Sequence, residues 1–391
     1  MSVINQAVIF CGGLGTRLMP LTKKLPKPMV KIKKKPFLQY LIEQCKSNGI
    51  KNFLLLSGYK HEIIKNFFGD GKKFGVNISH HYNPPNIETY KRIFEARRKL
   101  HSQFLLMYAD NYSSLNLLDL FKHHKKNKSK LTISICEKKK ANISLSSSNQ
   151  MIRKYFFKKN KKAKYVDIGY MITDKKTLIR NFPDKNITFS YFIDSLVKQN
   201  KAYYYINDTG YLSISDLKRY NNSKKFFNDK YILIDRDGVL NLKNKNHYYV
   251  RNLNELKINY DFLKKLKKIV KNKKLICISN QAGISTGDLK HKDLKQINKK
   301  IKIELKKRNI HLKDYFISYH HFNSNHFFRK PNHGLFLKAA KKYNFILDRT
   351  FYIGDDLRDI EAAYRSKTKC IYIGREKLSV KLKKKYINTL I

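Results

Sequence analysis

A short apolar run in the middle of the chain, Tyr231–Ile234, leads directly into Asp235-Arg236-Asp237-Gly238. An uninterrupted apolar run of this length is typical of a strand buried on both faces of a parallel sheet. Gly238 lets the chain turn where that strand ends. The two carboxylates suit phosphate transfer, because one can attack phosphorus while the other moves the leaving-group proton. A buried strand that begins this late in the chain also predicts a second fold unit.

Both halves of the 391-residue chain alternate short apolar runs with amphipathic segments. This rhythm favours an α/β fold with parallel strands and helices on both faces, and the length suits two domains. Polar residues without an apolar period, Asn221–Lys225, precede the strand at Tyr231. We therefore expect a linker at 221–229, a first domain at 1–222 and a second at 229–391.

The expected strands are residues 7–10, 52–57, 104–108, 231–234, 275–279 and 350–353, and the expected helices are 37–47, 61–68, 261–270 and 291–308. Two lysine-dense stretches, 122–130 and 158–164, are expected to be solvated loops or helix ends.

Positive charge dominates the composition, with 83 lysines and arginines against 29 acids and a formal net charge of +54. Dense positive charge is one mark of nucleic-acid binding. Here, however, lysine, asparagine and isoleucine crowd every segment, as an AT-rich genome would produce. Either way, the surface field attracts anionic metabolites. We expect no nucleic-acid partner, and a basic nucleic-acid-binding protein is the alternative from a different class.

The five cysteines lie far apart and form no CxxC pair, which disfavours a thiolate zinc site and a disulfide framework. No apolar run approaches the roughly 20 residues of a membrane span. The first residues lack the basic and apolar segments of a signal peptide. A cytoplasmic protein without membrane contact is expected, and homo-oligomerisation is left open.

Glycines follow the first expected strand, in Gly12-Gly13-Leu14-Gly15-Thr16-Arg17. Glycine lets backbone N–H groups approach phosphate closely, and Arg17 adds a charged fork for phosphate oxygens. The loop matches neither GxxxxGK[ST] nor GxGxxG. It continues through Leu18-Met19-Pro20-Leu21-Thr22 to Pro26-Lys27-Pro28-Met29. There the flanking prolines fix the backbone of Lys27, as suits a lysine aimed at phosphate.

The run from Gly12 to Met29 resembles the signature GGxGTRLxPLT…PKPM of the sugar-phosphate nucleotidyltransferases, over roughly residues 1–220. The resemblance implies a Rossmann-like (GT-A-like) domain that joins a nucleoside triphosphate to a sugar 1-phosphate, releases pyrophosphate and uses Mg²⁺. By resemblance, the nucleotide is lined by Gly12, Gly13, Gly15 and Thr16, the triphosphate is held by the catalytic Arg17 and Lys27, Mg²⁺ is bound by Asp110 and Asp208, and the sugar phosphate meets Lys158 and Gly169.

Two segments depart from this family's pattern. Where many members begin a helix with glycine and alanine, this chain reads Ile87-Glu88-Thr89-Tyr90-Lys91-Arg92. Where many read Glu-Lys-Pro, it reads Phe157-Lys158-Lys159. These segments touch base and sugar in the family, so the identities of the nucleotide and the sugar stay open.

Three further motifs follow the central aspartates in order: Ile278-Ser279-Asn280-Gln281, Arg329-Lys330-Pro331 and Gly354-Asp355-Asp356-Leu357-Arg358-Asp359. The first ends a strand with a hydroxyl and an amide for phosphate, and the second supplies cations. The third supplies acids, whose hard oxygens suit Mg²⁺. Asp355 and Asp359 are four apart and share a face if a helix begins there.

The set DxDG…SNQ…RKP…GDxxxD resembles the haloacid-dehalogenase superfamily, over roughly residues 229–391. Within it, the set is most similar to the branch of heptose-bisphosphate and histidinol-phosphate phosphatases, which implies a doubly wound α/β domain with Mg²⁺. By resemblance, Asp235 is the nucleophile that forms an aspartyl-phosphate and a metal ligand, Asp237 is the general acid/base and gives a backbone carbonyl to the metal, Asp355 is a metal ligand supported by Asp359, Ser279 and Lys330 bind the phosphoryl group, and Asn280 and Arg329 orient substrate.

Phosphatases of this branch often carry a zinc loop of cysteines and histidine just before Arg-Lys-Pro. Residues 318–328 contain His320, His321 and His326 but no cysteine, and Ser318 and Phe328 occupy ligand positions. We expect no bound zinc and interpret the histidines as part of a polar loop that borders the active site.

A nucleotidyltransferase joined to such a phosphatase suggests consecutive steps of one pathway. The resemblance implies that the second half removes the 7-phosphate of D-glycero-D-manno-heptose 1,7-bisphosphate. The first half then transfers a nucleotidyl group, with GTP favoured, to the resulting heptose 1-phosphate. Two alternatives keep the enzyme class: the same activities on another sugar phosphate and nucleotide, or an active phosphatase beside a decayed transferase half.

Overall fold

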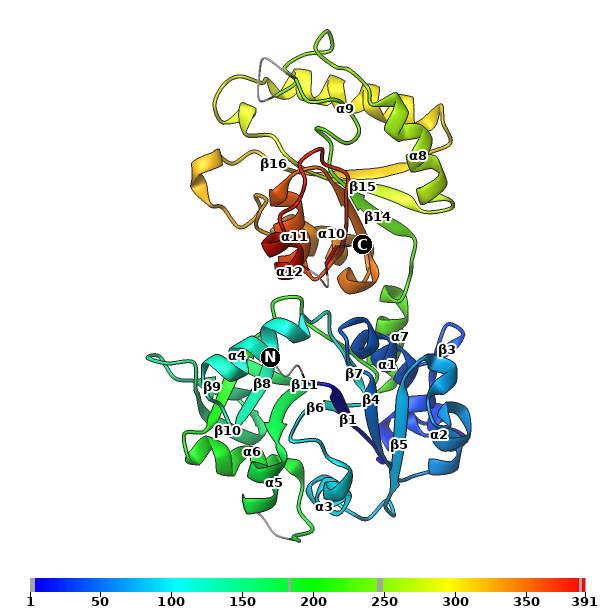
Figure 1. The fold of residues 1–391 in the computed structure, drawn as a ribbon, viewed down its shortest axis with the longest axis vertical. Coiled ribbons are helices and arrows are strands. Elements are labelled where there is room, and N and C mark those ends of the chain that lie inside the picture. The colour runs from blue at the N-terminus through cyan, green and yellow to red at the C-terminus, as the bar shows by residue number, and fades with distance from the viewer. Residues whose placement is uncertain (1–3, 182–183, 245–248, 387–388, 391) are drawn as a thin grey trace. The chain divides into compact units, whose positions relative to one another are not determined.

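The chain folds into two compact units, Met1–Lys224 and Lys225–Ile391 (Figure 1). The structure is a computed structural model that describes residues 4–181, 184–244, 249–386 and 389–390. Each unit is an α/β structure with its own sheet and its own buried core. Among the described helices, none combines the length and the apolar content that crossing a bilayer requires.

The sheet of the first unit is parallel in one half. β1 (Gln6–Cys11) lies between β4 (Asn52–Ser57) and β6 (Gln103–Tyr108), and both neighbours run parallel to it. β5 (Asn77–Tyr82) extends the parallel half beyond β4. β1, β4 and β6 are fully or largely buried apolar runs, so the predicted strands at 7–10, 52–57 and 104–108 are confirmed.

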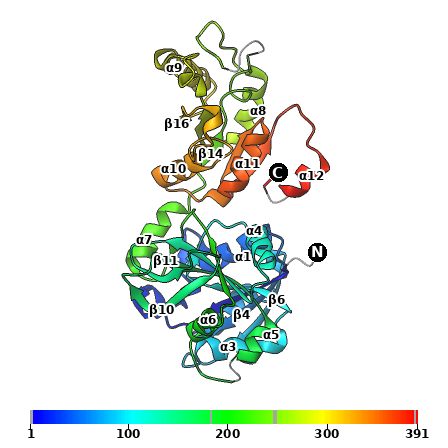
Figure 2. The same ribbon diagram turned by 90° about the vertical axis from the view of Figure 1, so that its left-hand side faces the viewer.

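Helices cover both faces of this sheet (Figure 2). α1 (Phe37–Ser47) and α2 (His61–Phe68) coincide with the predicted helices. On one face, the Cys45 thiol of α1 meets the Met107 sulfur of β6 at 3.4 Å. On the other face, α3 (Thr89–Glu95) and α6 (Phe189–Lys198) pack their apolar side chains against β1, β4 and β6 in one core.

The other half of the sheet corrects the expectation of a parallel arrangement. β11 (Tyr165–Asp174) runs antiparallel to β6 and to β8 (Leu131–Glu137). β9 (Ala141–Leu145) and β10 (Ile152–Asn160) form an antiparallel pair at the edge. The apolar rhythm that predicts a strand carries no information on its direction. Lys158 therefore lies in an edge strand, where lysine stays solvated, and not in a loop or helix end.

The remaining elements of the first unit are short: β2 (Lys31–Ile32), β3 (Lys35–Pro36), β7 (Asn111–Tyr112), α4 (Leu117–Lys126), α5 (Lys175–Asn181), β12 (Ala202–Ile206), β13 (Leu212–Ser213) and α7 (Leu217–Phe226). α4 places the lysines of the 122–130 stretch at a helix end, as expected.

The segment expected to be an irregular linker at 221–229 begins as the end of α7. The helix is tied to the first unit through polar groups, which is why its sequence lacks an apolar period. The Ser223 hydroxyl donates to the Ser213 carbonyl at 2.9 Å, and the Tyr220 hydroxyl donates to the Lys31 carbonyl at 2.7 Å.

The second unit contains a five-stranded parallel sheet in the order β16-β15-β14-β17-β18. Its strands are β14 (Tyr231–Ile234), β15 (Lys274–Asn280), β16 (Leu312–Ser318), β17 (Phe351–Gly354) and β18 (Lys369–Tyr372). Helices cover both faces, as predicted: α8 (Tyr260–Val270) and α9 (His291–Lys306) on one, α10 (Gly334–Tyr343) and α11 (Leu357–Ser366) on the other, with α12 (Val380–Lys385) following.

Alternation along β14 shows why its sequence reads as a continuous apolar run. Ile232 and Ile234 belong to the core under α8 and α9, whereas Leu233 belongs to the core under α10 and α11. Both faces of the strand are therefore buried. Because β14, β15 and β17 are adjacent and parallel, their carboxyl ends bring three of the sequence motifs to one edge of the sheet.

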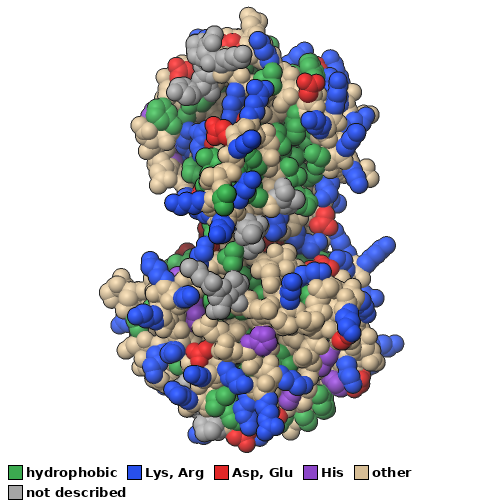
Figure 3. Space-filling view, viewed as in Figure 1, with side chains coloured by type: hydrophobic (Ala, Val, Ile, Leu, Met, Phe, Trp, Pro, Cys, Tyr) green, Lys and Arg blue, Asp and Glu red, His purple; other side chains and the backbone are tan. Residues whose placement is uncertain are grey.

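Lysine and arginine side chains are scattered over the visible face of each unit and do not gather in one stripe (Figure 3). On this face, the described residues therefore show no single basic track of the kind that a nucleic-acid backbone follows.

Candidate active sites

A cavity of about 590 Å³ lies at the carboxyl edge of the second sheet. Its lining includes every residue that the sequence predicts for the phosphatase site: Asp235, Asp237, Ser279, Asn280, Arg329, Lys330, Asp355 and Asp359. It also includes charged residues that the motifs do not single out, above all Lys243, Asp356 and Arg358.

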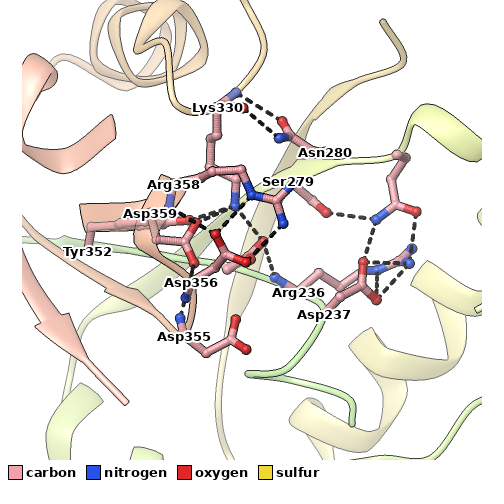
Figure 4. Close-up of polar contacts among 12 residues, drawn as sticks. Arg236, Asp237, Ser279, Asn280, Lys330, Tyr352, Asp355, Asp356, Arg358 and Asp359 are labelled. Carbon is pink, nitrogen blue, oxygen red and sulfur yellow. Dashed lines mark hydrogen bonds and ion pairs between the residues drawn. The ribbon is translucent and has the colours of Figure 1, made fainter. Parts of the chain in front are cut away.

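The Lys330 ammonium lies at the centre of this site (Figure 4). It is 2.8 Å from Asp235 Oδ1 and 2.7 Å from Asp359 Oδ1, and it donates to the Tyr352 hydroxyl at 2.9 Å. Lys330 is only 4% exposed. Burial would lower its pKa, but the two carboxylates outweigh burial and raise that pKa well above its ordinary value. The cation is therefore fixed beside the proposed nucleophile.

For the Asp235 carboxyl group, burial outweighs the ion pair, whereas for Lys330 the ion pairs outweigh burial. Burial raises its pKa, and the ion pair with Lys330 opposes that rise. Its Oδ1 also accepts a hydrogen bond from the Arg236 backbone N–H at 2.7 Å. This arrangement leaves a buried carboxyl group at the end of β14, next to a cation that can also neutralise a phosphate.

Asp237 is held differently, although it lies only two residues away. Arg236 donates to both of its oxygens, Asn241 donates to Oδ1 at 3.0 Å and Gln281 donates to Oδ2 at 2.6 Å. Burial would raise the pKa of Asp237, but Arg236 and these hydrogen bonds outweigh it and hold that pKa below its ordinary value. The two aspartates thus occupy separate electrostatic environments.

The Arg236 guanidinium and the Gln281 amide are positioning groups to which the sequence motifs assign no role. Both side chains are fully buried. Gln281 also donates to the Ser279 hydroxyl at 2.9 Å and accepts from Arg236 at 2.9 Å, so it links the two motifs. The sequence signal for both was their position directly beside a predicted site residue at a strand end, and Gln281 is also the last residue of the SNQ motif.

Asn280 and Arg329 have partners that restrict their proposed role in orienting substrate. The Asn280 amide donates to the Lys330 carbonyl and its oxygen accepts from the Lys330 N–H, both at 3.0 Å. It therefore positions Lys330 through the backbone. Arg329 donates to the His320 carbonyl at 3.2 Å and lines the cavity. The carboxylates of Asp235 and Asp359 are paired with Lys330 instead.

Three carboxylates could hold a metal ion. Asp235, Asp355 and Asp359 each offer an oxygen, and these oxygens lie within 4.8 Å of one another. Asp355 Oδ1 is buried without a hydrogen-bond partner, and such an oxygen is costly unless a cation or water reaches it. Hard carboxylate oxygens suit Mg²⁺. The donor set therefore fits the expected ion.

Lys243, in the segment after β14, reaches Asp355 of this set and the neighbouring Asp356. Its ammonium is 2.6 Å from Asp355 Oδ2 and 3.9 Å from Asp356. Arg358 makes two hydrogen bonds to Asp356, each 2.9 Å long. Burial would raise the pKa of Asp356, but Arg358 outweighs it and lowers that pKa. Cations from two separate segments, Lys243 and Arg358, thus pair with the adjacent acids Asp355 and Asp356 in the lining of the cavity.

The segment 318–328, which precedes Arg329 and contains His320, His321 and His326, is called the aromatic loop. His320 and His326 stack with ring centroids 3.3 Å apart. The Nδ1 atoms of His321 and His326 accept backbone N–H groups at 3.3 and 3.1 Å. In neutral rings this places the proton on Nε2, which is then not available as a metal ligand.

A second cavity, of about 260 Å³, lies at the carboxyl edge of the first sheet. Four predicted residues line it, namely Gly12, Gly13, Lys27 and Asp110. The Lys27 ammonium lies 2.8 Å from Asp110 Oδ2, so a cation and a carboxylate meet at the wall of this cavity. Asp110 is the one lining carboxylate that the sequence assigns to Mg²⁺, and Mg²⁺ bound to a nucleotide needs only one or two.

Gly15 adopts a left-handed conformation, with φ of 70°, and its carbonyl accepts the Thr22 hydroxyl at 2.9 Å. A Cβ there would lie 3.0 Å from Lys27 Cβ, so glycine lets the loop close over the lysine. Thr16 and Arg17 are exposed and lie outside the cavity lining.

The predicted sugar-side residues are more scattered. Gly169 packs against Tyr108, which lines the cavity, and its φ of 85° excludes most side chains. Lys158 and Asp208 are exposed and outside the lining. Asp167, which motif matching passed over, accepts the Gly169 N–H at 2.7 Å. Burial raises its pKa to about 7, and the Asp110 carboxylate adds to the rise.

Comparison with known proteins finds a different family within each unit. Residues 6–145 match the family described as Nucleotidyl transferase, and residues 230–373 match the family described as Polynucleotide kinase 3 phosphatase.

Relatives of the first unit include D-glycero-alpha-D-manno-heptose 1-phosphate guanylyltransferases. That of Campylobacter jejuni is 35% identical over 130 residues, which are 33% of this chain and 57% of the relative. That of Aneurinibacillus thermoaerophilus is 34% identical over 131 residues, 33% of this chain and 56% of the relative. The chain thus spans just over half the length of these two relatives.

Among solved structures, HddC from Yersinia pseudotuberculosis in complex with GMP-PN covers 56% of this chain and 97% of its own, with 23% identity and a TM-score of 0.49. By the two family matches, the chain carries, in this order, a segment that matches the nucleotidyl transferase family and a segment that matches a phosphatase family.

Proposed function

We propose that this protein performs two consecutive steps of nucleotide-sugar synthesis. The second unit hydrolyses the 7-phosphate of D-glycero-D-manno-heptose 1,7-bisphosphate, and the first unit transfers a nucleotidyl group from GTP to the heptose 1-phosphate. The observation that carries the proposal is Lys330 paired with Asp235 and Asp359, beside a buried unpaired oxygen of Asp355. The match to heptose 1-phosphate guanylyltransferases supports the choice of sugar and base.

In the phosphatase step, Asp235 attacks phosphorus and an aspartyl-phosphate forms as the sugar oxygen leaves. Lys330 neutralises the phosphoryl oxygens. Mg²⁺ held by Asp235, Asp355 and Asp359 would shield the anionic nucleophile from the anionic ester. To act as the general acid, Asp237 must first take up a proton, because its present surroundings hold its pKa low. It then gives that proton to the leaving sugar oxygen and takes one back from the water that attacks the aspartyl-phosphate and releases orthophosphate. Both Asp237 oxygens are engaged by Arg236, Asn241 and Gln281, so this role requires its side chain to turn towards Asp235.

In the transferase step, an oxygen of the sugar 1-phosphate attacks the α-phosphorus of the nucleotide and pyrophosphate leaves. No covalent enzyme intermediate is needed, so the unit positions the substrates and neutralises charge. Gly12 and Gly13 present backbone to the phosphates at the cavity wall, and Lys27 offsets the charge that develops. Asp110 would hold Mg²⁺ for the triphosphate.

The test incubates the protein with Mg²⁺, heptose 1,7-bisphosphate and each of the four nucleoside triphosphates in turn. Orthophosphate, pyrophosphate and nucleotide-sugar are followed together. We expect orthophosphate in every reaction, and pyrophosphate with nucleotide-sugar when GTP is present. Heptose 1-phosphate supplied directly should bypass the first step. Absence of phosphate release from the bisphosphate would refute the phosphatase assignment.

A 3′-phosphorylated oligonucleotide is the control substrate. The family match to polynucleotide phosphatases and the net charge of +54 both favour testing that class. Faster release from the oligonucleotide than from the sugar, with a steep loss on adding salt, would indicate a nucleic-acid substrate.

A further inference from the structure

Arg92 is a buried cation at the wall of the first unit's cavity. It lies in α3, and its side chain is only 3% exposed. Arginine is almost never buried to this degree unless its donors are satisfied. Burial lowers its pKa from the ordinary value, but a guanidinium keeps its charge in proteins. A positive charge is therefore fixed beneath the cavity.

The guanidinium donates to four backbone carbonyls from two segments. Nη1 donates to Ser57 at 2.6 Å and to Asn83 at 3.0 Å, and Nη2 donates to Pro84 at 3.2 Å and to Ile87 at 2.8 Å. Ser57 ends β4, and the other three belong to the loop between β5 and α3. One side chain thus ties the end of a central strand to a cavity-lining loop.

The same guanidinium supports the glycine loop. A Cβ on Gly12 would lie 2.6 Å from both Cζ and Nη1 of Arg92, and a Cβ on Gly58 would lie 2.8 Å from Nη1. No side chain can shift aside here, because four hydrogen bonds fix the guanidinium. Gly12 is therefore required by contact with Arg92, and its backbone rests directly on the planar group.

We infer that Arg92 is a positioning residue for the nucleoside triphosphate, an inference that rests on the proposed transferase function. It holds Gly12 and residues 83–87 as one wall of the nucleotide site, and its charge favours the anionic phosphates above it. Its donors point to carbonyls rather than into the cavity, so it acts through the loop and not by contacting the reacting atoms.

The test compares Arg92→Lys with Arg98→Lys in the full-length protein. Lysine keeps the charge but cannot reach four carbonyls at once. Arg98 is exposed and close by in the sequence, which makes it the matched control. Arg92→Lys should raise the KM for GTP about tenfold, with kcat and the KM for heptose 1-phosphate within about twofold. Arg98→Lys should match wild type in all three.

Gly12→Ala provides a second, independent disturbance of the same contact. This variant should also lower the affinity for GTP. In the double variant with Arg92→Lys, the fold-loss of affinity should be smaller than the product of the two single fold-losses, because both substitutions act on one contact. Calorimetric titration with GTP measures the affinity without turnover. Phosphate release by the second unit reports the amount of active protein in every sample.

The possible results separate a failure of the Arg92 inference from a failure of the proposed transferase function. If wild type forms nucleotide-sugar and Arg92→Lys keeps the wild-type KM and affinity for GTP, the inference is wrong and the function stands. Equal losses for GTP and sugar phosphate with a lower melting temperature would show a purely structural role, which also overturns the inference. If wild type neither turns over nor binds GTP, the transferase proposal and the inference fail together.

Discussion

Asp235 and Asp237 differ more in surroundings than their spacing suggests. Asp235 meets Lys330, whereas Asp237 lies against Arg236, Asn241 and Gln281. The sequence predicts a division of labour between two carboxylates, because DxDG ends a buried strand. It does not predict which groups enforce that division, since Gln281 directly follows another strand, β15, and its side chain could equally have faced the cavity.

At this scale we predict that Asp235→Asn reduces phosphate release by more than about a thousandfold, because the amide cannot attack phosphorus. Pyrophosphate release from GTP and heptose 1-phosphate should stay within about twofold of wild type. The exposed Asp261 in α8 is the matched control, and Asp261→Asn should leave both rates unchanged. Retention of a tenth of the phosphatase rate would exclude Asp235 as the nucleophile.

Elements were more predictable than their directions. α1, α2 and β4 coincide with the predicted ranges because burial imposes a clear period on each. β11 runs antiparallel because of how strands from distant parts of the chain pair, which no local pattern records. α7 was missed because hydrogen bonds, rather than an apolar face, tie it to its unit.

The aromatic loop at 318–328 leads to a prediction about metal content. His321 and His326 already accept backbone N–H groups, and the loop has no cysteine. Protein purified without added metal should contain less than about 0.1 zinc per chain by elemental analysis. Exchange of His320 and His326 for asparagine should not change that value. One zinc per chain, lost in the double variant, would contradict this expectation.

α4 contributes a pH-dependent stability. His124 is buried against β8, where its Nδ1 lies 2.9 Å from the Thr132 hydroxyl. Burial lowers its pKa from 6.5 to about 4, and Asp174 only partly opposes this. Between pH 6.5 and pH 4, His124 is therefore protonated in the unfolded state but neutral in the folded state. Stability is complete above pH 6.5 and is lost as pH falls towards 4, by up to about 3 kcal/mol.

Pulse proteolysis across a urea series, scoring peptides of the first unit, measures this loss. The urea midpoint of wild type should fall between pH 6.5 and pH 4.5, and His124→Gln should fall less steeply. Parallel slopes for the two proteins would show that another group titrates. His101, which is exposed, provides the control as His101→Gln.

At the scale of the whole molecule, each unit has its own sheet, core and cavity. We therefore predict that the two activities can be removed independently. Asp110→Asn should stop nucleotide-sugar formation and leave phosphate release intact. Asp235→Asn should stop phosphate release but still form nucleotide-sugar from supplied heptose 1-phosphate. Mixing the two variants should restore conversion of the bisphosphate to nucleotide-sugar, because heptose 1-phosphate diffuses between molecules. Failure of the mixture, with each single activity present, would show that the intermediate must stay on one chain.

Because both units lie on one chain, the two proposed catalysts are always made in a one-to-one ratio. Every ribosome that completes this polypeptide makes one copy of each proposed catalyst, so changes in expression cannot alter their stoichiometry. Balance between the steps must then come from turnover numbers and substrate affinities. A mutation that slows the transferase unit would let heptose 1-phosphate accumulate in proportion, and no increase in gene dosage could correct the imbalance between the two steps.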